Sequence, residues 1–128
     1  MSSLKSITAL NGPPAAGPYC HAVVTSGMVF CSGQIPVDKD GNVVEGDIQA
    51  HTKQCLKNLA IVLQASGSDL NHVAKVTIFL ADMGDFAKVN ETYAEIFGSH
   101  KPARACVAVK TLPKNVDVEI ECIAVVAQ

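Results

Sequence analysis

The sequence predicts a single α+β domain over residues 1–128, a two-layer sandwich in which a mixed sheet of about six strands carries two helices on one face. Three observations lead to this prediction. The chain has 128 residues, which suits one hydrophobic core and leaves no room for a second. Two segments repeat apolar residues with helical spacing. The other segments are short, rich in β-branched residues and separated by turns.

The first part of the chain predicts a hairpin followed by a long loop. Residues 21–25 and 28–31 are short β-prone runs around Ser26-Gly27, a typical hairpin turn. Residues 34–46 contain three turn signals, Pro36, Asp40-Gly41 and Gly46, and predict a loop with turns. A further strand fits before residue 10. The predicted order is therefore β-β-α-β-α-β-β, with this additional strand in front.

The first helix is expected from Asp47, which is suited to cap its N-terminus, to about residue 66, where Gly67 can end it. Its apolar positions keep to one side: Ile48, Cys55, Leu56, Leu59, Val62 and Leu63. Residues 73–81 then form a continuous β-rich run.

The second helix is expected over about residues 83–97, with Asp82 as its cap and Gly98 after its end. Its predicted core stripe consists of Phe86, Val89, Tyr93, Ile96 and Phe97.

Two strands, residues 103–109 and 116–126, close the chain around a turn at residues 112–115. Side chains alternate across a strand, so each strand has two sets of residues. The purely apolar sets are assigned to the face under the helices: Ala103, Ala105, Val107 and Val109 in one strand, and Val118, Ile120, Cys122, Ala124 and Val126 in the other. The second face then carries Arg104, Cys106, Glu119 and Glu121 among apolar residues, which predicts an interface between subunits with polar clefts.

Composition limits the function classes. Charged residues make up 17% and hydrophobic residues 48%, which suggests that some surface is hidden between subunits. The net charge is −2, the basic residues are scattered and Trp is absent, so the sequence argues against a nucleic-acid surface. No apolar run has the length of a membrane-spanning helix.

Cysteine and histidine spacing indicates neither a disulfide framework nor a metal site. The five cysteines are odd in number and form no C-x-x-C pair, which predicts a reducing compartment. No Cys/His pair has the spacing of zinc ligands. The N-terminus has no signal-peptide pattern, although an atypical organelle signal stays open.

Arg104 and the two glutamates are the candidates for chemistry. The guanidinium of Arg104 presents a planar fork that matches a carboxylate at two points. An ion pair with Glu119 or Glu121, serving structure alone, is the alternative. One of these glutamates is suited to orient or deprotonate water, and the alternative is that both are solvated acids on an edge strand.

The other candidates have weaker signals. Cys106 has no histidine tied to it by sequence, which favours a packing role for its thiol over a nucleophile. Ser32-Gly33 ends a strand, where glycine permits a close approach or makes an ordinary turn. Tyr19 can flank a ligand or cap the core. Asn90 can bond across an interface, but a solvated helix residue is commoner.

Five segments together resemble the reactive intermediate deaminase family, also called the RidA or YjgF family. The likeness covers nearly the whole chain. The segments are Ala16-Gly17-Pro18-Tyr19, Ser32-Gly33-Gln34-Ile35-Pro36, Val89-Asn90-Glu91-Thr92-Tyr93, Pro102-Ala103-Arg104-Ala105-Cys106-Val107 and Val118-Glu119-Ile120-Glu121.

The resemblance implies a chorismate-mutase-like fold and a homotrimer whose sheets form an inner barrel with clefts between subunits. It implies cofactor-free hydrolysis of 2-iminobutanoate and 2-iminopropanoate, which escape from pyridoxal-phosphate enzymes, to 2-oxo acids and ammonia. Arg104 would bind the substrate carboxylate, the backbone at Cys106 would contact the imine nitrogen and Glu119 would place water. Tyr19, Ser32, Gly33 and Asn90 would line the cleft with Arg104. The expected location is the cytoplasm, with a mitochondrial pool left open.

Two other functions remain as alternatives at this point. One is an endoribonuclease or translation inhibitor, an activity also ascribed to relatives. The other is a non-catalytic module that binds a small ligand or acts as a chaperone.

Overall fold

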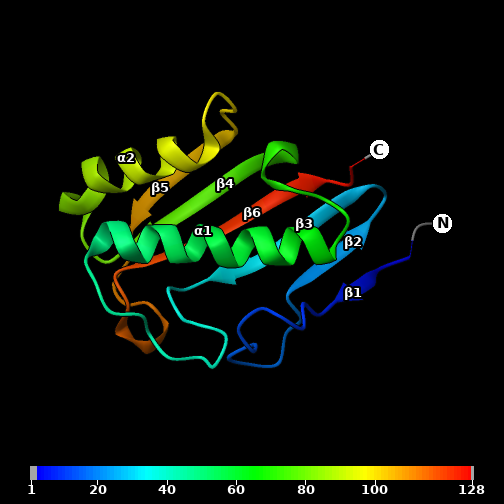
Figure 1. Cartoon of the computed structure of the whole chain (residues 1–128), viewed down its shortest axis with the longest axis horizontal. Coiled ribbons are helices and arrows are strands. Elements are labelled where there is room, and N and C mark those ends of the chain that lie inside the picture. Colours follow the sequence, from blue (N-terminus) through cyan, green and yellow to red (C-terminus); the bar gives the residue numbers. More distant parts are fainter. Residues whose placement is uncertain (1–2, 128) are drawn as a thin grey trace.

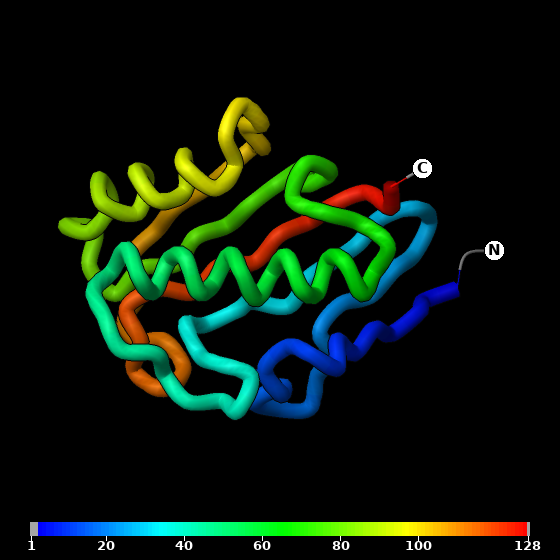
Figure 2. Tube along the Cα trace, in the orientation of Figure 1, coloured from blue at the N-terminus to red at the C-terminus, as the bar shows by residue number. Residues whose placement is uncertain are grey.

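The computed structural model describes residues 3–127 and has the predicted element order, including the strand before residue 10 (Figures 1 and 2). The strands are β1 (Lys5–Ile7), β2 (Ala22–Thr25), β3 (Met28–Gln34), β4 (Val73–Leu80), β5 (Ala103–Ala108) and β6 (Val118–Val125). The helices are α1 (Ile48–Ala65) and α2 (Phe86–Phe97), with short 3-10 turns η1 (Leu70–His72), η2 (Met83–Asp85) and η3 (Pro113–Asn115).

The six strands form one mixed sheet in the order β1-β2-β3-β6-β4-β5. The pair β4–β5 is parallel, because α2 lies in the connection between them, and every other pair is antiparallel. Both helices lie on the same face of this sheet (Figure 1). The prediction of a two-layer α+β sandwich is confirmed.

Helix α1 begins and ends where its capping residues predict. The side chain of Asp47 accepts a hydrogen bond from the backbone N–H of Ala50 at 3.0 Å. After Ser66 the chain leaves the helix through Gly67, whose φ of +80° favours glycine. The six predicted stripe residues are all buried and pack against the sheet.

The second predicted helix divides into η2 and α2. Asp82 caps η2 by accepting from the N–H of Gly84, and Gly98 with φ +63° follows α2. The prediction that Phe86 belongs to the core stripe was wrong, because this residue is 38% exposed. The first turn of α2 lies beside Arg104 on the edge strand β5, so the ring of Phe86 meets a guanidinium instead of the core.

The prediction of which β5 residues face the helices was also wrong. In the parallel register, Arg104 and Cys106 pair with Val76 and Ile78 of β4, which are fully buried under the helices. Arg104 and Cys106 therefore point to the helix-covered face. For β6 the prediction is confirmed, since Val118, Ile120, Cys122 and Ala124 are buried.

Glu119 and Glu121 lie on the open face, as predicted, together with the β5 residues that were expected under the helices. Phe30, Val107 and Val125 are 43%, 46% and 38% exposed on this face. Neither α1 nor α2 covers it. An apolar face of this kind, with β5 as an unpaired edge strand, is typical of a surface that associates with another copy.

A small second core lies under the loop that follows β3. It consists of Ile35, Val37, Leu112 and Val116. The side-chain amide of Asn58, buried in α1, donates to the carbonyl oxygens of Ile35 and Val37 at 3.2 and 3.0 Å. These bonds fix the loop on one wall of the larger cavity described below.

Candidate functional site

The predicted site residues separate into two groups in one chain. We call Asn90, Arg104 and Cys106, together with Tyr93, the arginine half-site. We call Tyr19, Ser32, Gly33 and Glu119 the glutamate half-site. The arginine half-site lines a cavity of about 320 Å³, and the glutamate half-site lines another of about 420 Å³. Cys106 and Ser32 are not among the lining residues of these cavities.

In the arginine half-site, the guanidinium of Arg104 lies over two aromatic rings of α2. Its central carbon is 4.9 Å from the ring centroid of Tyr93 and 5.6 Å from that of Phe86. Among residues 3–127 it has no hydrogen bond or ion pair. The alternative of a structural ion pair between Arg104 and Glu119 or Glu121 does not hold within one chain.

Two more polar groups of this half-site have no partner in the described residues. The side-chain oxygen of Asn90 and the hydroxyl of Tyr93 are buried without a hydrogen bond. Buried polar atoms are nearly always paired, and each unpaired one costs about 1–3 kcal/mol. The half-site therefore has a cation and a carboxamide oxygen available for groups from outside the chain.

Cys106 presents its backbone polar groups at the free edge of β5. The N–H of Val109 bonds to the carbonyl oxygen of Leu80, and backbone groups alternate along a strand, so the N–H and C=O of Cys106 face the free edge of the sheet. Burial raises the pKa of the Cys106 thiol, and nearby Arg104 offsets this only in part. The thiol is protonated at neutral pH, which disfavours a nucleophilic role.

In the glutamate half-site, Gly33 and the carboxylate of Glu119 are in close contact. The register between β3 and β6 shifts between Cys31 and Gln34, and this bulge brings the backbone of Gly33 against Glu119. A methyl group at Gly33 would lie 2.6 Å from Oε2 of Glu119. Burial, followed by the charge of Glu121, raises the pKa of Glu119.

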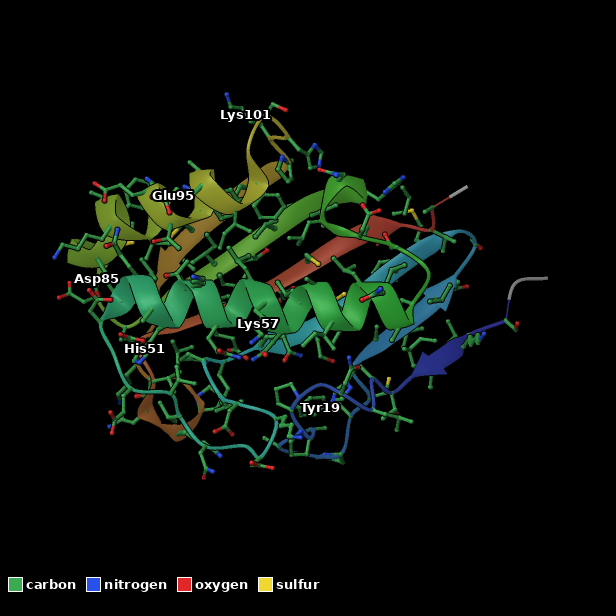
Figure 3. All side chains as sticks on the ribbon, in the orientation of Figure 1. Tyr19, His51, Lys57, Asp85, Glu95 and Lys101 are labelled. Atoms are coloured by element: carbon green, nitrogen blue, oxygen red, sulfur yellow. The ribbon has the colours of Figure 1, made fainter. Side chains whose placement is uncertain are left out.

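Hydrogen bonds tie Ser32 and Tyr19 to the loop before β2. The hydroxyl of Ser32 donates to the carbonyl oxygen of Cys20 at 2.7 Å. The hydroxyl of Tyr19 accepts from the N–H of Ala16 at 3.1 Å, and Tyr19 lies in the loop at the lower edge of Figure 3. These bonds give both residues a structural role in shaping the cavity.

Three residues at or beside the half-sites, His21, Phe86 and Tyr93, were not predicted from the sequence. His21 is 4% exposed, lines the glutamate cavity and accepts at Nδ1 from the N–H of Ala9, so its neutral ring carries the proton on Nε2. Its position in a predicted strand end gave no signal for this. Phe86, Asn90 and Tyr93 are spaced by four and three residues on one helix face, and that spacing was a usable signal.

The two half-sites do not meet within one chain. Arg104 pairs with Val76, which pairs with Cys122, and Glu119 lies three residues before Cys122 in β6. Two strand spacings and three residues separate the backbones of Arg104 and Glu119 by about 14 Å, and their side chains point to opposite faces. A small acid held by Arg104 is therefore out of reach of Glu119 in the same chain.

We expect Glu121→Gln to shift the acid limb of the pH–kcat/KM profile to lower pH. A carboxylate that activates water must be ionised, so activity falls as the pH drops through the pKa of Glu119. The charge of Glu121 raises this pKa, and its removal lowers it. Profiles of the wild type and the variant on one substrate provide the test, because the titration of the substrate is common to both. An acid limb that stays in place or moves to higher pH contradicts the expectation that Glu119 is the carboxylate that activates water.

Comparison with known proteins identifies the family. The model of the family described as Endoribonuclease L-PSP matches residues 9–126. A 2-iminobutanoate/2-iminopropanoate deaminase of Salmonella typhimurium is 44% identical over 124 residues, covering 94% of this chain and 97% of that protein. The chain belongs to the RidA/YjgF family.

Further members of the RidA/YjgF family show the range of named relatives. The mitochondrial protein mmf1 of Schizosaccharomyces pombe is 53% identical over 122 residues, covering 91% of this chain and 75% of that protein. The crystal structure of Escherichia coli TdcF with bound serine aligns with a TM-score of 0.90 and 40% identity, covering 96% and 99% of the two chains. A member of the family thus binds a small amino acid.

The described part of the chain has neither a metal-binding cluster nor a membrane-spanning helix. Residues 3–127 contain no cluster of three or more His, Cys, Asp or Glu side chains arranged to hold a metal ion. Within the same residues, no helix has the length and apolarity needed to cross a bilayer.

Proposed function

We propose that this protein hydrolyses 2-iminobutanoate and 2-iminopropanoate to the corresponding 2-oxo acids and ammonia, in sites formed between the subunits of a homotrimer. The observation that carries the proposal is the half-buried guanidinium of Arg104, which has no anionic partner among residues 3–127. The likeness to a Salmonella typhimurium protein named for this activity supports the choice of substrate.

The reaction needs positioning and electrostatics more than strong chemistry. A protonated imine carbon is already electrophilic, so the protein has to hold the carboxylate, keep the nitrogen cationic and aim one water. Arg104 binds the carboxylate at two points. The backbone carbonyl of Cys106, at the free edge of β5, accepts a hydrogen bond from the imine N–H and favours the protonated form.

Glu119 handles the proton of the attacking water. The water oxygen bonds to the imine carbon, the C=N electron pair moves to nitrogen, and the Glu119 carboxylate takes the released proton. Glu119 then returns this proton to the nitrogen. The neighbouring hydroxyl then gives its proton to the Glu119 carboxylate and closes to the carbonyl, the C–N bond breaks, and the ammonia that leaves takes up this proton as ammonium. The balance is one protonated imine and one water giving one 2-oxo acid and one ammonium ion, with no oxidant or cofactor.

The separation of the half-sites supports an assembly in which neighbouring chains supply Arg104 and Glu119. A single small substrate does not span about 14 Å between opposite faces of one sheet. The apolar open face and the unpaired edge of β5 offer the surface for such an assembly. We place the activity in the cytoplasm, and the mitochondrial relative of Schizosaccharomyces pombe supports an additional pool in mitochondria.

The test generates 2-iminobutanoate in situ with a deaminating enzyme and follows its decay. Faster release of 2-oxobutanoate and ammonia with the wild-type protein supports the proposal. Binding of 2-oxobutanoate without any acceleration of imine decay supports a non-catalytic binding module instead, because a binder releases no ammonia.

Endoribonuclease activity is the second candidate, since the family description carries that name. The net charge of −2 gives it little electrostatic support. RNA cleavage that is present in the wild type and lost in Arg104→Ala with the fold retained would favour it. Cleavage that survives this substitution would indicate contamination.

A further inference from the structure

The guanidinium of Arg104 contacts two aromatic rings and has no counter-ion in the described part of the chain. Among residues 3–127 its only partners are Tyr93 at 4.9 Å and Phe86 at 5.6 Å, measured from the guanidinium carbon to the ring centroids. Charged side chains are seldom buried without a partner, and residues 3–127 provide no carboxylate within ion-pair distance of this guanidinium. The edge position of β5 also leaves Arg104 without a strand neighbour on one side.

The ring of Phe86 has little other function in the fold. Tyr93 is 8% exposed and packs in the core with its ring centroid 4.5 Å from that of Phe97. Phe86 is 38% exposed and belongs to neither core cluster of the described residues. An exposed aromatic ring at the start of α2 needs a reason other than core packing, and its contact with the guanidinium provides one.

We propose that Phe86 and Tyr93 are positioning residues that hold Arg104 as a preorganised cation with its N–H groups free for the substrate carboxylate. A carboxylate in their place would orient the arginine equally well but would occupy the same N–H donors and compete with the substrate. An aromatic face attracts the cation through the ring quadrupole and uses no donor in the guanidinium plane. The inference deepens the proposed function and rests on Arg104 as the carboxylate anchor.

The neighbouring groups fit this arrangement. Asn90 lies between Phe86 and Tyr93 on the same helix face and lines the same cavity as Arg104. Its buried side-chain oxygen has no hydrogen-bond partner among residues 3–127. An oxygen acceptor at this position repels a carboxylate but accepts a hydrogen bond from an N–H, so it suits the imine nitrogen of the same substrate. The aromatic pair would thus set the position of the carboxylate relative to Asn90.

The test compares Phe86→Leu with Phe86→Tyr, because Phe86 can be changed without opening the core. Leucine keeps an apolar side chain but removes the ring face, whereas tyrosine keeps the face. For Phe86→Leu we expect KM for 2-iminobutanoate and Kd for the unreactive carboxylate 2-oxobutanoate to rise about three- to tenfold, with kcat within about twofold of wild type. Phe86→Tyr should retain wild-type values.

A second measurement separates this inference from the proposed function. The order parameter of the Arg104 Nε–H bond, measured by ¹⁵N relaxation, should fall in Phe86→Leu and stay high in Phe86→Tyr. An unchanged order parameter and unchanged KM in Phe86→Leu, with Arg104→Ala inactive, would overturn the aromatic positioning and leave the deaminase proposal standing. A reduced order parameter with Arg104→Ala fully active would keep the aromatic contact and overturn the anchor role.

Discussion

Arg104→Ala is expected to lower kcat/KM for 2-iminobutanoate by about 10²- to 10³-fold, because loss of a buried charged hydrogen-bonding partner costs about 2–5 kcal/mol. The fold should survive the change, since the Arg104 guanidinium lies over two aromatic rings and makes no ion pair with any of the described residues. The in situ imine assay measures the loss, and thermal unfolding checks stability.

Arg104→Lys is the matched control for this prediction. Lysine keeps the positive charge but not the planar fork that binds a carboxylate at two points. Its activity should lie between those of the wild type and of Arg104→Ala. Wild-type kcat/KM in Arg104→Ala would remove the anchor from the proposal.

Mixing subunits tests where the two half-sites meet. If Arg104 and Glu119 of different chains form each site, co-expressed Arg104→Ala and Glu119→Gln chains restore about a quarter of the sites in randomly assembled trimers. Each inactive variant then regains activity in the mixture. The control co-expresses Arg104→Ala with the double variant, in which no chain has Arg104. No recovery in mixed oligomers verified by mass spectrometry would place the site within one chain.

Local sequence signals were sufficient to predict most of the fold. Asp47 and Gly67 mark the two ends of α1, because capping depends on residues within one turn of the helix end. The order of strands and helices follows from periodicity and turn residues in the same way. These signals depend on residues that are close in the sequence, so they can be read without knowledge of the tertiary structure.

The orientation of β5 could not be predicted, because alternation tells which residues share a face but not which face the helices cover. Ala103, Ala105 and Val107 form the more apolar set, yet they lie on the open face, and Arg104 and Cys106 face the helices. The parallel register with β4 decides this, and that register is a long-range property. An apolar set on the open side is consistent with burial by a second copy rather than by the chain's own helices.

The site residues were predicted by resemblance to a family, whereas their arrangement required the structure. The distance between Arg104 and Glu119 depends on the strand order β6-β4-β5, which cannot be predicted from a local sequence pattern. The contact of Phe86 with Arg104 could not be predicted for a related reason. The helical spacing placed Phe86 on the correct face of α2, but only the location of β5 shows that a guanidinium lies under that face.

Gly33→Ala is expected to lower kcat by about 10- to 100-fold with little change in stability. The φ of Gly33 is not in the left-handed region, so the backbone accepts alanine. The new methyl group would lie 2.6 Å from Oε2 and 2.9 Å from the carboxyl carbon of Glu119, and this flexible side chain would rotate away. A displacement of about 1 Å at a catalytic group is enough for a loss of this size.

A double-mutant cycle distinguishes this cause from general damage. If Gly33→Ala acts only by moving the Glu119 carboxylate, it costs nothing further in a Glu119→Gln background, because that carboxylate is already gone. Gly12→Ala is the matched control, since Gly12 also lacks a positive φ and its added methyl would make ordinary contacts of 3.5 Å or more. It should leave kcat unchanged. Additive losses for Gly33→Ala and Glu119→Gln would mean that Gly33 affects the reaction by another route, such as direct contact with the substrate, and that the close approach to Glu119 is not the reason for glycine at this position.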